Sequence, residues 1–178
     1  MSSQTFLIKS DSALFIDRDG VINTLRVDDY VKQISEFELL PEVIPALDIL
    51  RPLFKRIFIV TNQQGIGKGL MVNSIEEIHN HFLSLLPSSI YPDKIYHCPH
   101  LKNENCICRK PKPGMALMAK SDFPEIQLSN SIMIGDSQSD MDFAKNSGIK
   151  PALVSSNNSS EYPTFNNILA FAQSLIQN

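Results

Sequence analysis

The sequence has no large excess of charge of either sign and no long apolar run, and both absences restrict its function. Its 178 residues carry a formal net charge of −3, which gives no basic surface for nucleic acid. No apolar stretch approaches the roughly 18 residues that a membrane-spanning helix needs. Residues 1–9 lack the apolar core of a secretory signal. We therefore expect a cytoplasmic protein that binds neither nucleic acid nor membrane.

The composition is that of an ordinary globular protein. Hydrophobic residues make up 43% of the chain and charged residues 20%. The length suits one domain with a full hydrophobic core, and no stretch of linker composition divides it. We expect a single domain over residues 1–178.

Short apolar runs alternate with helical patterns along the chain. Four runs are typical of strands buried on both faces, and they lie at residues 13–16, 57–60, 132–134 and 152–154. A shorter candidate strand lies at residues 94–97. This alternation predicts an α/β fold with a parallel sheet covered by helices on both faces. Ligands of such folds bind beyond the carboxyl ends of the strands.

The helical patterns carry recognisable start and stop signals. Apolar residues recur at helical spacing over residues 43–50, and a last helix is expected at about residues 166–177. Ser74 and Glu77 fit a capping box at the start of another helix. Gly148 is typical of a left-handed helix end and closes a helix expected over residues 141–147.

Two carboxylates directly follow the first predicted strand. Asp17 and Asp19 are two positions apart, so both can reach one pocket past the strand end. A carboxylate at Asp17 can attack phosphorus and form an acyl-phosphate, while Asp19 is placed to donate a proton to the leaving group and later accept one from water. The alternative is a simple Asx-type turn at Asp19–Gly20.

Polar and basic residues at two later points can bind a phosphate group. Thr61 and Asn62 follow the second strand, where hydroxyl and amide groups can hold phosphate oxygens. Lys110 is the candidate phosphate-binding lysine, and Arg109 can clamp another anionic or hydroxyl-bearing part of a substrate. The alternative for both basic residues is a solvated surface position.

A third acidic position completes a candidate cation site. Asp136 follows the third strand, and with the Asp17 carboxylate and the Asp19 carbonyl it offers only oxygen ligands. Hard oxygen ligands beside a phosphate favour Mg²⁺. Asp140 is expected to support this site or to orient Lys110. Its alternative role is that of an acidic residue favoured by the helix dipole.

All three cysteines lie within eleven positions, and a histidine lies among them. Cys98, His100, Cys106 and Cys108 form a complete tetrahedral zinc set, with no position left for water. We therefore expect a structural zinc ion that folds the loop over residues 98–108. A redox Cys-x-Cys pair and incidental buried thiols are the alternatives, and both leave the Cys98/His100 pair unexplained. His97 is the rival imidazole, but it should point away from Cys98.

These motifs together resemble the four ordered motifs of the haloacid dehalogenase (HAD) superfamily of phosphatases. The resemblance covers residues 13–148, and the zinc loop resembles a branch with heptose bisphosphate and histidinol-phosphate phosphatases. It implies a three-layer Rossmann-like fold, a nucleophile and a general acid/base, phosphate binders, and Mg²⁺ ligands. The implied nucleophile is Asp17, and the implied general acid/base is Asp19. The implied phosphate binders are Thr61 and Lys110. The implied Mg²⁺ ligands are Asp17, Asp19 and Asp136.

The motif spacing leaves no room for a large cap domain, so loops should frame the pocket. We expect these to be residues 24–37, residues 64–72 and the zinc loop, around a small phosphorylated metabolite bound by a monomer. Pro113–Gly114 and Asn23 resemble the heptose enzymes and favour a heptose 1,7-bisphosphate substrate, with histidinol phosphate as the alternative. Less favoured are a silent sugar-phosphate-binding protein and a nucleic-acid end phosphatase.

Overall fold

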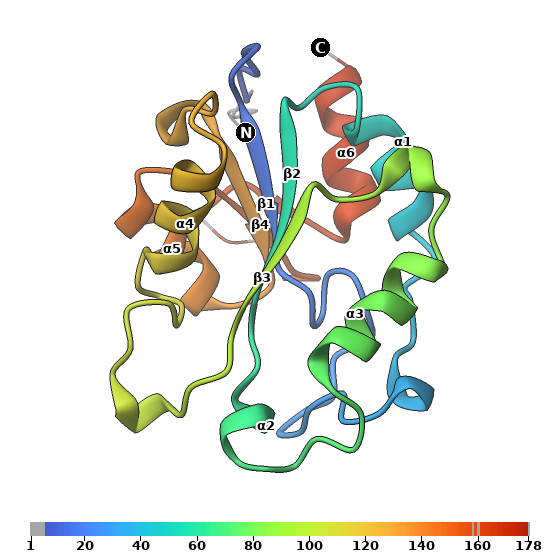
Figure 1. The fold of residues 1–178 in the computed structure, drawn as a ribbon. Coiled ribbons are helices and arrows are strands. Elements are labelled where there is room, and N and C mark those ends of the chain that lie inside the picture. The colour runs from blue at the N-terminus through green and yellow to red at the C-terminus, as the bar shows by residue number, and fades with distance from the viewer. Residues whose placement is uncertain (1–5, 158, 160, 178) are drawn as a thin grey trace.

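A six-stranded parallel sheet forms the centre of the molecule in the computed structural model, which describes residues 6–157, 159 and 161–177 (Figure 1). The ends of the expected domain, residues 1–5 and 178, lie outside the described residues. The strand order is β3-β2-β1-β4-β5-β6. The strands are β1 (Ala13–Ile16), β2 (Arg56–Asn62), β3 (Lys94–Cys98), β4 (Ile132–Gly135), β5 (Lys150–Val154) and β6 (Thr164–Phe165).

Helices cover both faces of this sheet, so the predicted three-layer α/β fold is confirmed. Helices α4 and α5 lie on one side, and α1, α3 and α6 lie on the other (Figure 1). The helices are α1 (Val43–Leu50), α2 (Gln64–Gly67), α3 (Ile75–Ser84), α4 (Gly114–Asp122), α5 (Gln138–Ser147) and α6 (Ile168–Ile176).

The central strands are apolar on both faces because each face supports its own core. In β1, Ala13 and Phe15 pack with residues of α4 and α5, whereas Leu14 and Ile16 pack with residues of α1, α3 and α6. This follows from the alternation of side chains along a strand. Burial on both sides holds β1 firmly and so positions the residues that directly follow it.

Several element boundaries differ from the sequence prediction. Strand β2 continues to Asn62, so Thr61 lies in the strand and not after it. Helix α5 begins at Gln138, because Ser137 and Asp140 form a capping box one turn earlier than the apolar pattern indicates. The structure also contains the short elements α2 and β6, which the sequence analysis did not predict. The Ser74 capping box and the Gly148 helix end are confirmed.

The connections between strands contain no separate cap domain within the described residues. Between β1 and β2 the chain forms a loop with one short 3-10 turn and then α1. Between β2 and β3 it forms α2 and α3. Among the described residues, no helix is long and apolar enough to cross a membrane.

Candidate active site

The predicted site residues converge at the carboxyl edge of the sheet, near the point where the strand order reverses between β1 and β4. Asp17 follows β1 directly, and its backbone N–H donates to the Ile134 carbonyl of β4 at 2.9 Å. Carboxyl oxygens of Asp17, Asp136 and Asp140 all lie within 4.8 Å of one another. An open α/β sheet binds its ligands at such a crevice.

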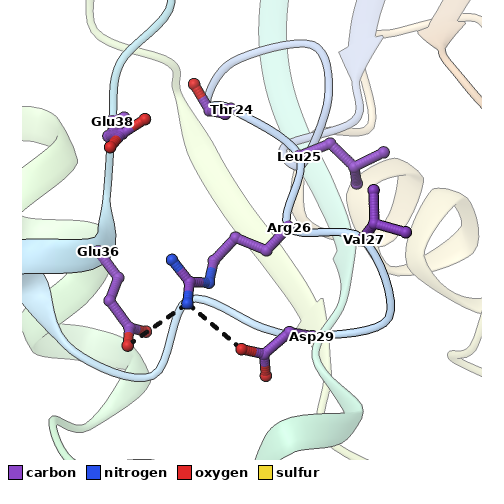
Figure 2. Close-up of a pocket in the computed structure, with 7 residues that line it drawn as sticks. All are labelled: Thr24, Leu25, Arg26, Val27, Asp29, Glu36 and Glu38. Atoms are coloured by element: carbon purple, nitrogen blue, oxygen red, sulfur yellow. Dashed lines mark hydrogen bonds and ion pairs between the residues drawn. The ribbon is translucent and has the colours of Figure 1, made fainter.

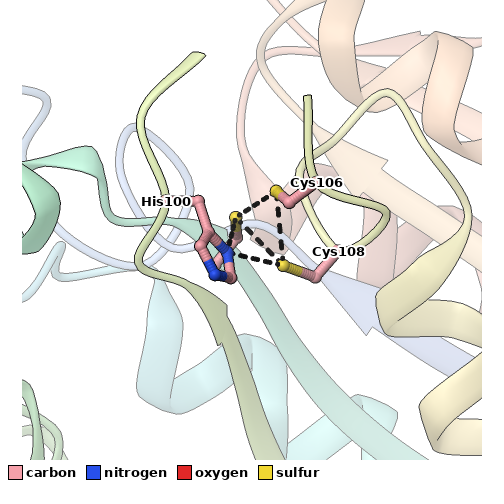
Figure 3. Close-up of side chains that lie close together, drawn as sticks. His100, Cys106 and Cys108 are labelled. Atoms are coloured by element: carbon pink, nitrogen blue, oxygen red, sulfur yellow. Dashed lines mark hydrogen bonds between the residues drawn. The ribbon is translucent and has the colours of Figure 1, made fainter. Parts of the chain in front are cut away.

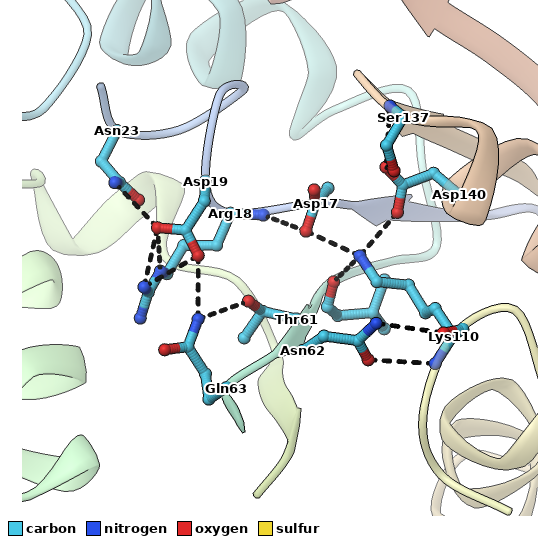
Figure 4. Close-up of polar contacts among 11 residues, drawn as sticks. Asp17, Arg18, Asp19, Asn23, Thr61, Asn62, Gln63, Lys110, Ser137 and Asp140 are labelled. Carbon is cyan, nitrogen blue, oxygen red and sulfur yellow. Dashed lines mark hydrogen bonds and ion pairs between the residues drawn. The ribbon is translucent and has the colours of Figure 1, made fainter. Parts of the chain in front are cut away.

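Lys110 lies buried at the centre of this group. Its Nζ lies 2.7 Å from an Asp17 oxygen and 2.6 Å from an Asp140 oxygen, and it donates to the Val60 carbonyl at 2.8 Å (Figure 4). Only 4% of the residue is exposed. A lysine is rarely buried this deeply unless it is paired. Asp140 therefore contacts Lys110 directly, and its role in orienting Lys110 stays a prediction.

Asn62 holds the segment that carries Lys110. Its side-chain amide donates to the Lys110 carbonyl at 3.1 Å and accepts from the Lys110 backbone N–H at 3.0 Å. The side-chain amide of Asn62, expected to face a phosphate, is thus paired with the backbone of Lys110. Thr61 is buried, and its hydroxyl oxygen accepts a hydrogen bond from Gln63 at 2.8 Å. Substrate contacts of Thr61 and Asn62 stay predictions.

Gly20 leaves the space that Asp136 occupies. Its φ is +88°, which L side chains rarely adopt, and a Cβ at this position would overlap the Asp136 carboxylate. The turn after β1 can therefore approach the end of β4 closely only with glycine at position 20.

The cluster brings three carboxyl groups around one ammonium group. Burial and then Asp140 raise the pKa of Asp17 well above its usual value. Burial, followed by Asp140, also raises the pKa of Asp136 to about 6. Burial disfavours the charged form of Lys110, but Asp140 and Asp17 raise its pKa overall. Three carboxylates around one ammonium group fit a divalent cation with oxygen ligands.

Asp19 is turned away from this cluster. Its two oxygens accept hydrogen bonds from Arg18 at 2.8 and 2.9 Å, from Asn23 at 3.0 Å and from Gln63 at 2.8 Å (Figure 4). Burial opposes ionisation, but Arg18 together with the hydrogen bonds from Asn23 and Gln63 outweighs it, and the pKa of Asp19 is lowered. No role for Arg18 or Gln63 was predicted from the sequence. The sequence signal that could have identified them is their position in the motifs, where Arg18 precedes Asp19 and Gln63 follows Thr61 by two positions.

A second cluster joins the end of β3 to the loop before α4. The three thiols lie 3.2 to 3.5 Å apart, and His100 Nδ1 lies 3.2 Å from Cys108 Sγ (Figure 3). With zinc–sulfur bonds of about 2.3 Å, tetrahedral ligands lie somewhat under ~4 Å apart, so the set fits zinc. His97 instead faces His79, with ring centroids 5.7 Å apart.

Two of the three segments expected to frame the pocket carry charged side chains near the site. In residues 24–37, Arg26 lies 3.3 Å from Asp29 and 3.7 Å from Glu36, beside a cavity of about 350 Å³ (Figure 2). Arg109 directly follows the zinc loop; it is half-buried, and its Nη1 has no hydrogen-bond partner among the described residues. This nitrogen is itself buried, and the substrate contact of Arg109 stays a prediction.

Comparisons with known proteins agree with this fold and site. A family model described as HAD-hydrolase-like matches residues 107–167. A D-glycero-alpha-D-manno-heptose-1,7-bisphosphate 7-phosphatase of Mycobacterium tuberculosis is 43% identical over 135 residues, which cover 75% of this chain and 71% of that protein. The Escherichia coli K12 D-glycero-beta-D-manno-heptose-1,7-bisphosphate 7-phosphatase is 38% identical, covering 78% of this chain and 75% of the relative.

A solved structure has the same overall fold. The crystal structure of D,D-heptose 1,7-bisphosphate phosphatase from B. bronchiseptica, complexed with magnesium and phosphate, superposes with a TM-score of 0.81 at 27% identity. The match covers 93% of this chain and 98% of that one. This chain therefore belongs to the HAD-like hydrolases, and it is a phosphatase. Within that family, the relatives described here are heptose bisphosphate phosphatases.

Proposed function

We propose that this phosphatase hydrolyses a phosphomonoester of a small sugar through transient phosphorylation of Asp17. The substrate we propose is D-glycero-D-manno-heptose 1,7-bisphosphate, with release of the phosphate at C7. The observation that carries the mechanism is the buried Lys110, held between Asp17 and Asp140 at the edge of the sheet. A lysine so placed can bind a phosphoryl oxygen next to the attacking carboxylate.

The reaction divides into two displacements at phosphorus. In the first, an Asp17 oxygen forms a bond to phosphorus while the bond to the sugar oxygen breaks, and Asp19 gives that oxygen a proton. In the second, water gives a proton to Asp19 and attacks phosphorus, which releases inorganic phosphate and regenerates Asp17. Thr61 and Lys110 would hold the phosphoryl oxygens throughout, with Lys110 giving up one of its three contacts to protein oxygens.

The residues that would hold Mg²⁺ are the Asp17 and Asp136 carboxylates and the Asp19 carbonyl, with Asp140 in support. When bound, the ion supplies positive charge that offsets the charge of the phosphoryl group. The support for this assignment is the close approach of three carboxyl groups and their all-oxygen chemistry. Zn²⁺ would bind separately to the Cys98, His100, Cys106 and Cys108 set and act structurally.

The relatives support the choice of substrate. Proteins 35–43% identical to this chain carry heptose-1,7-bisphosphate 7-phosphatase names, so the histidinol-phosphate alternative is not favoured. Both alpha- and beta-anomer enzymes occur among them, for example in Campylobacter jejuni and Helicobacter pylori. Arg109 is the residue we assign to a second anionic or hydroxyl-bearing part of the substrate. We further propose one cytoplasmic domain that acts as a monomer.

The test is an assay of phosphate release with and without Mg²⁺, using both anomers of the heptose bisphosphate and histidinol phosphate. We expect Mg²⁺-dependent turnover of a heptose anomer and at least ~10³-fold less in Asp17→Asn, since a carboxamide is not a nucleophile. Asp48→Asn, at an exposed position of α1, is the control with normal turnover. Normal turnover in Asp17→Asn would reject the nucleophile, and preference for histidinol phosphate would reject the substrate.

A further inference from the structure

Arg18 is the largest side chain that is fully buried in the described structure, although it carries a positive charge. Its ion pair is formed with Asp19, whose own side chain is 26% exposed. One guanidinium nitrogen, Nη1, is buried without a hydrogen-bond partner among the described residues. Burying a charge in this way contributes little to stability, because its desolvation offsets the attraction. The position of Arg18 therefore calls for a functional explanation.

The Arg18 guanidinium donates several hydrogen bonds to the Asp19 carboxylate from one side. Nη2 lies 2.8 Å from one oxygen and 2.9 Å from the other, and Nε lies 3.3 Å from the first. A planar guanidinium fixes both the position and the plane of a carboxylate, which an ammonium group does not. Arg18 itself is immobilised by complete burial, so the Asp19 carboxylate has one well-defined orientation.

This orientation is linked to the expected phosphate site. The Gln63 side-chain amide donates to Asp19 at 2.8 Å and to the Thr61 hydroxyl at 2.8 Å. This one amide group therefore bridges the Asp19 and Thr61 side chains. Asp17 pairs with Lys110 on the other side (Figure 4). Asp19 is thereby kept apart from the cluster of Asp17, Asp136 and Asp140, which already contains three carboxylates.

We propose that Arg18 is a positioning residue for acid–base catalysis by Asp19. It holds the Asp19 carboxylate in one orientation, clear of Lys110 and of the carboxylate cluster. Because the guanidinium favours the ionised form of Asp19, what Arg18 contributes to proton transfer is alignment and not acidity. Without Arg18, the Asp19 side chain can rotate towards Lys110 and lose its alignment with the leaving group. This inference rests on the proposed roles of Asp17 and Asp19.

The experiment compares two simple aryl esters, phenyl phosphate and p-nitrophenyl phosphate, in wild-type protein, Arg18→Met and Arg18→Lys. The nitrophenolate is a weak base that leaves with little help from an acid, whereas phenolate needs the proton. A positioned general acid contributes about 10²–10⁴-fold. We expect kcat of Arg18→Met to fall at least ~10-fold more for phenyl phosphate than for p-nitrophenyl phosphate. In Arg18→Lys, the fall in kcat should differ less between the two esters than in Arg18→Met.

A purely structural role for Arg18 predicts a different result. The two esters would then lose activity by the same factor, and that outcome overturns the proposal. If Arg18→Met does not fold, as judged by circular dichroism, the comparison is made with Arg18→Lys and Gln63→Leu, which disturb the same carboxylate. Arg51→Met removes an arginine paired with Asp93, remote from the site, and should leave the ratio unchanged. The proposed function is tested separately by phosphate release from the heptose bisphosphate, so its failure is distinguished from failure of the role proposed for Arg18.

Discussion

At the scale of single residues, the chemistry depends on how each buried charge is paired. Lys110 interacts with two carboxylates, and Arg18 interacts with the one carboxylate that points away from them. This pairing separates a residue proposed to attack phosphorus from a residue proposed to transfer protons. The two carboxylates are only two positions apart, so their different environments come from their partners and not from sequence distance.

His79 gives a residue-scale prediction about pH and stability. It is buried, and burial, followed by the charge of Arg18, lowers its pKa to about 3. The unfolded chain then binds a proton near pH 6.5 that the folded protein does not, so stability is lost as pH falls from about 6.5 towards 3. This loss should reach on the order of 2 kcal/mol at pH 5.

The measurement is urea unfolding of wild-type protein and His79→Phe at pH 7 and pH 5. Phenylalanine cannot bind a proton, so the variant should lose less stability than the wild type over this interval. Asp17 and Asp136 have raised pKa values and act in the opposite direction, but they are present in both proteins and cancel in the difference. Equal losses in the two proteins would show that His79 accepts a proton in the folded state.

At the scale of elements, β2, β3 and the zinc loop form one connected unit. The Gln63 N–H donates to the Cys98 carbonyl at 2.8 Å, and the Gly67 N–H donates to the Pro99 carbonyl at 3.0 Å. Cys98 ends β3, while Cys108 lies two residues before Lys110. The Cys98, His100, Cys106 and Cys108 cluster therefore joins the end of β3 to the segment that carries Lys110 to Asp17.

Loss of zinc should act through this loop. Cys108→Ser should reduce bound zinc from about one ion per chain to near none and lower activity at least ~10-fold, because a structural metal site contributes directly to folding. Protease cleavage within residues 98–108 should become faster. Metal analysis, turnover and limited proteolysis measure these three effects. His97→Gln is the matched control, since His97 lies outside the cluster, and it should retain zinc; its loss there would show that His97 is a ligand.

At the scale of the whole molecule, the absence of a separate cap in the described residues leaves the sheet edge framed by loops. Loop residues 24–37 contact the α2 region through Tyr30, whose hydroxyl accepts hydrogen bonds from Gln64 at 3.4 Å and Lys68 at 3.3 Å. The Gln64 amide oxygen accepts from the Lys102 N–H at 2.9 Å, which ties in the zinc loop. The three expected rim segments thus support one another around the site.

All residues of the proposed site come from a single chain, so catalysis should not need a second copy. Light scattering during gel filtration should give the monomer mass of 20.0 kDa. Specific activity should also stay constant on dilution. A dimer mass, together with activity that falls on dilution, would contradict the expected monomer.

The sequence by itself determined the features that depend on neighbouring residues. Residues 13–16 were predicted as a strand and form β1, and the Ser74 capping box was predicted where it occurs. The zinc ligand set was also predicted from spacing, and the structure brings those side chains together. Strand periodicity, helix caps and short metal-binding loops are local, so they can be read along the chain.

Only the tertiary structure decided which partner each polar side chain takes. Asn62 binds the backbone of Lys110, 48 positions away, and Gln63 joins Asp19 to Thr61. The short helix α2 has too few residues for a periodic pattern and is held by contacts with the zinc loop. These choices depend on the rotamers and burial that distant elements impose, and such constraints exist only once the sheet and its two layers have packed.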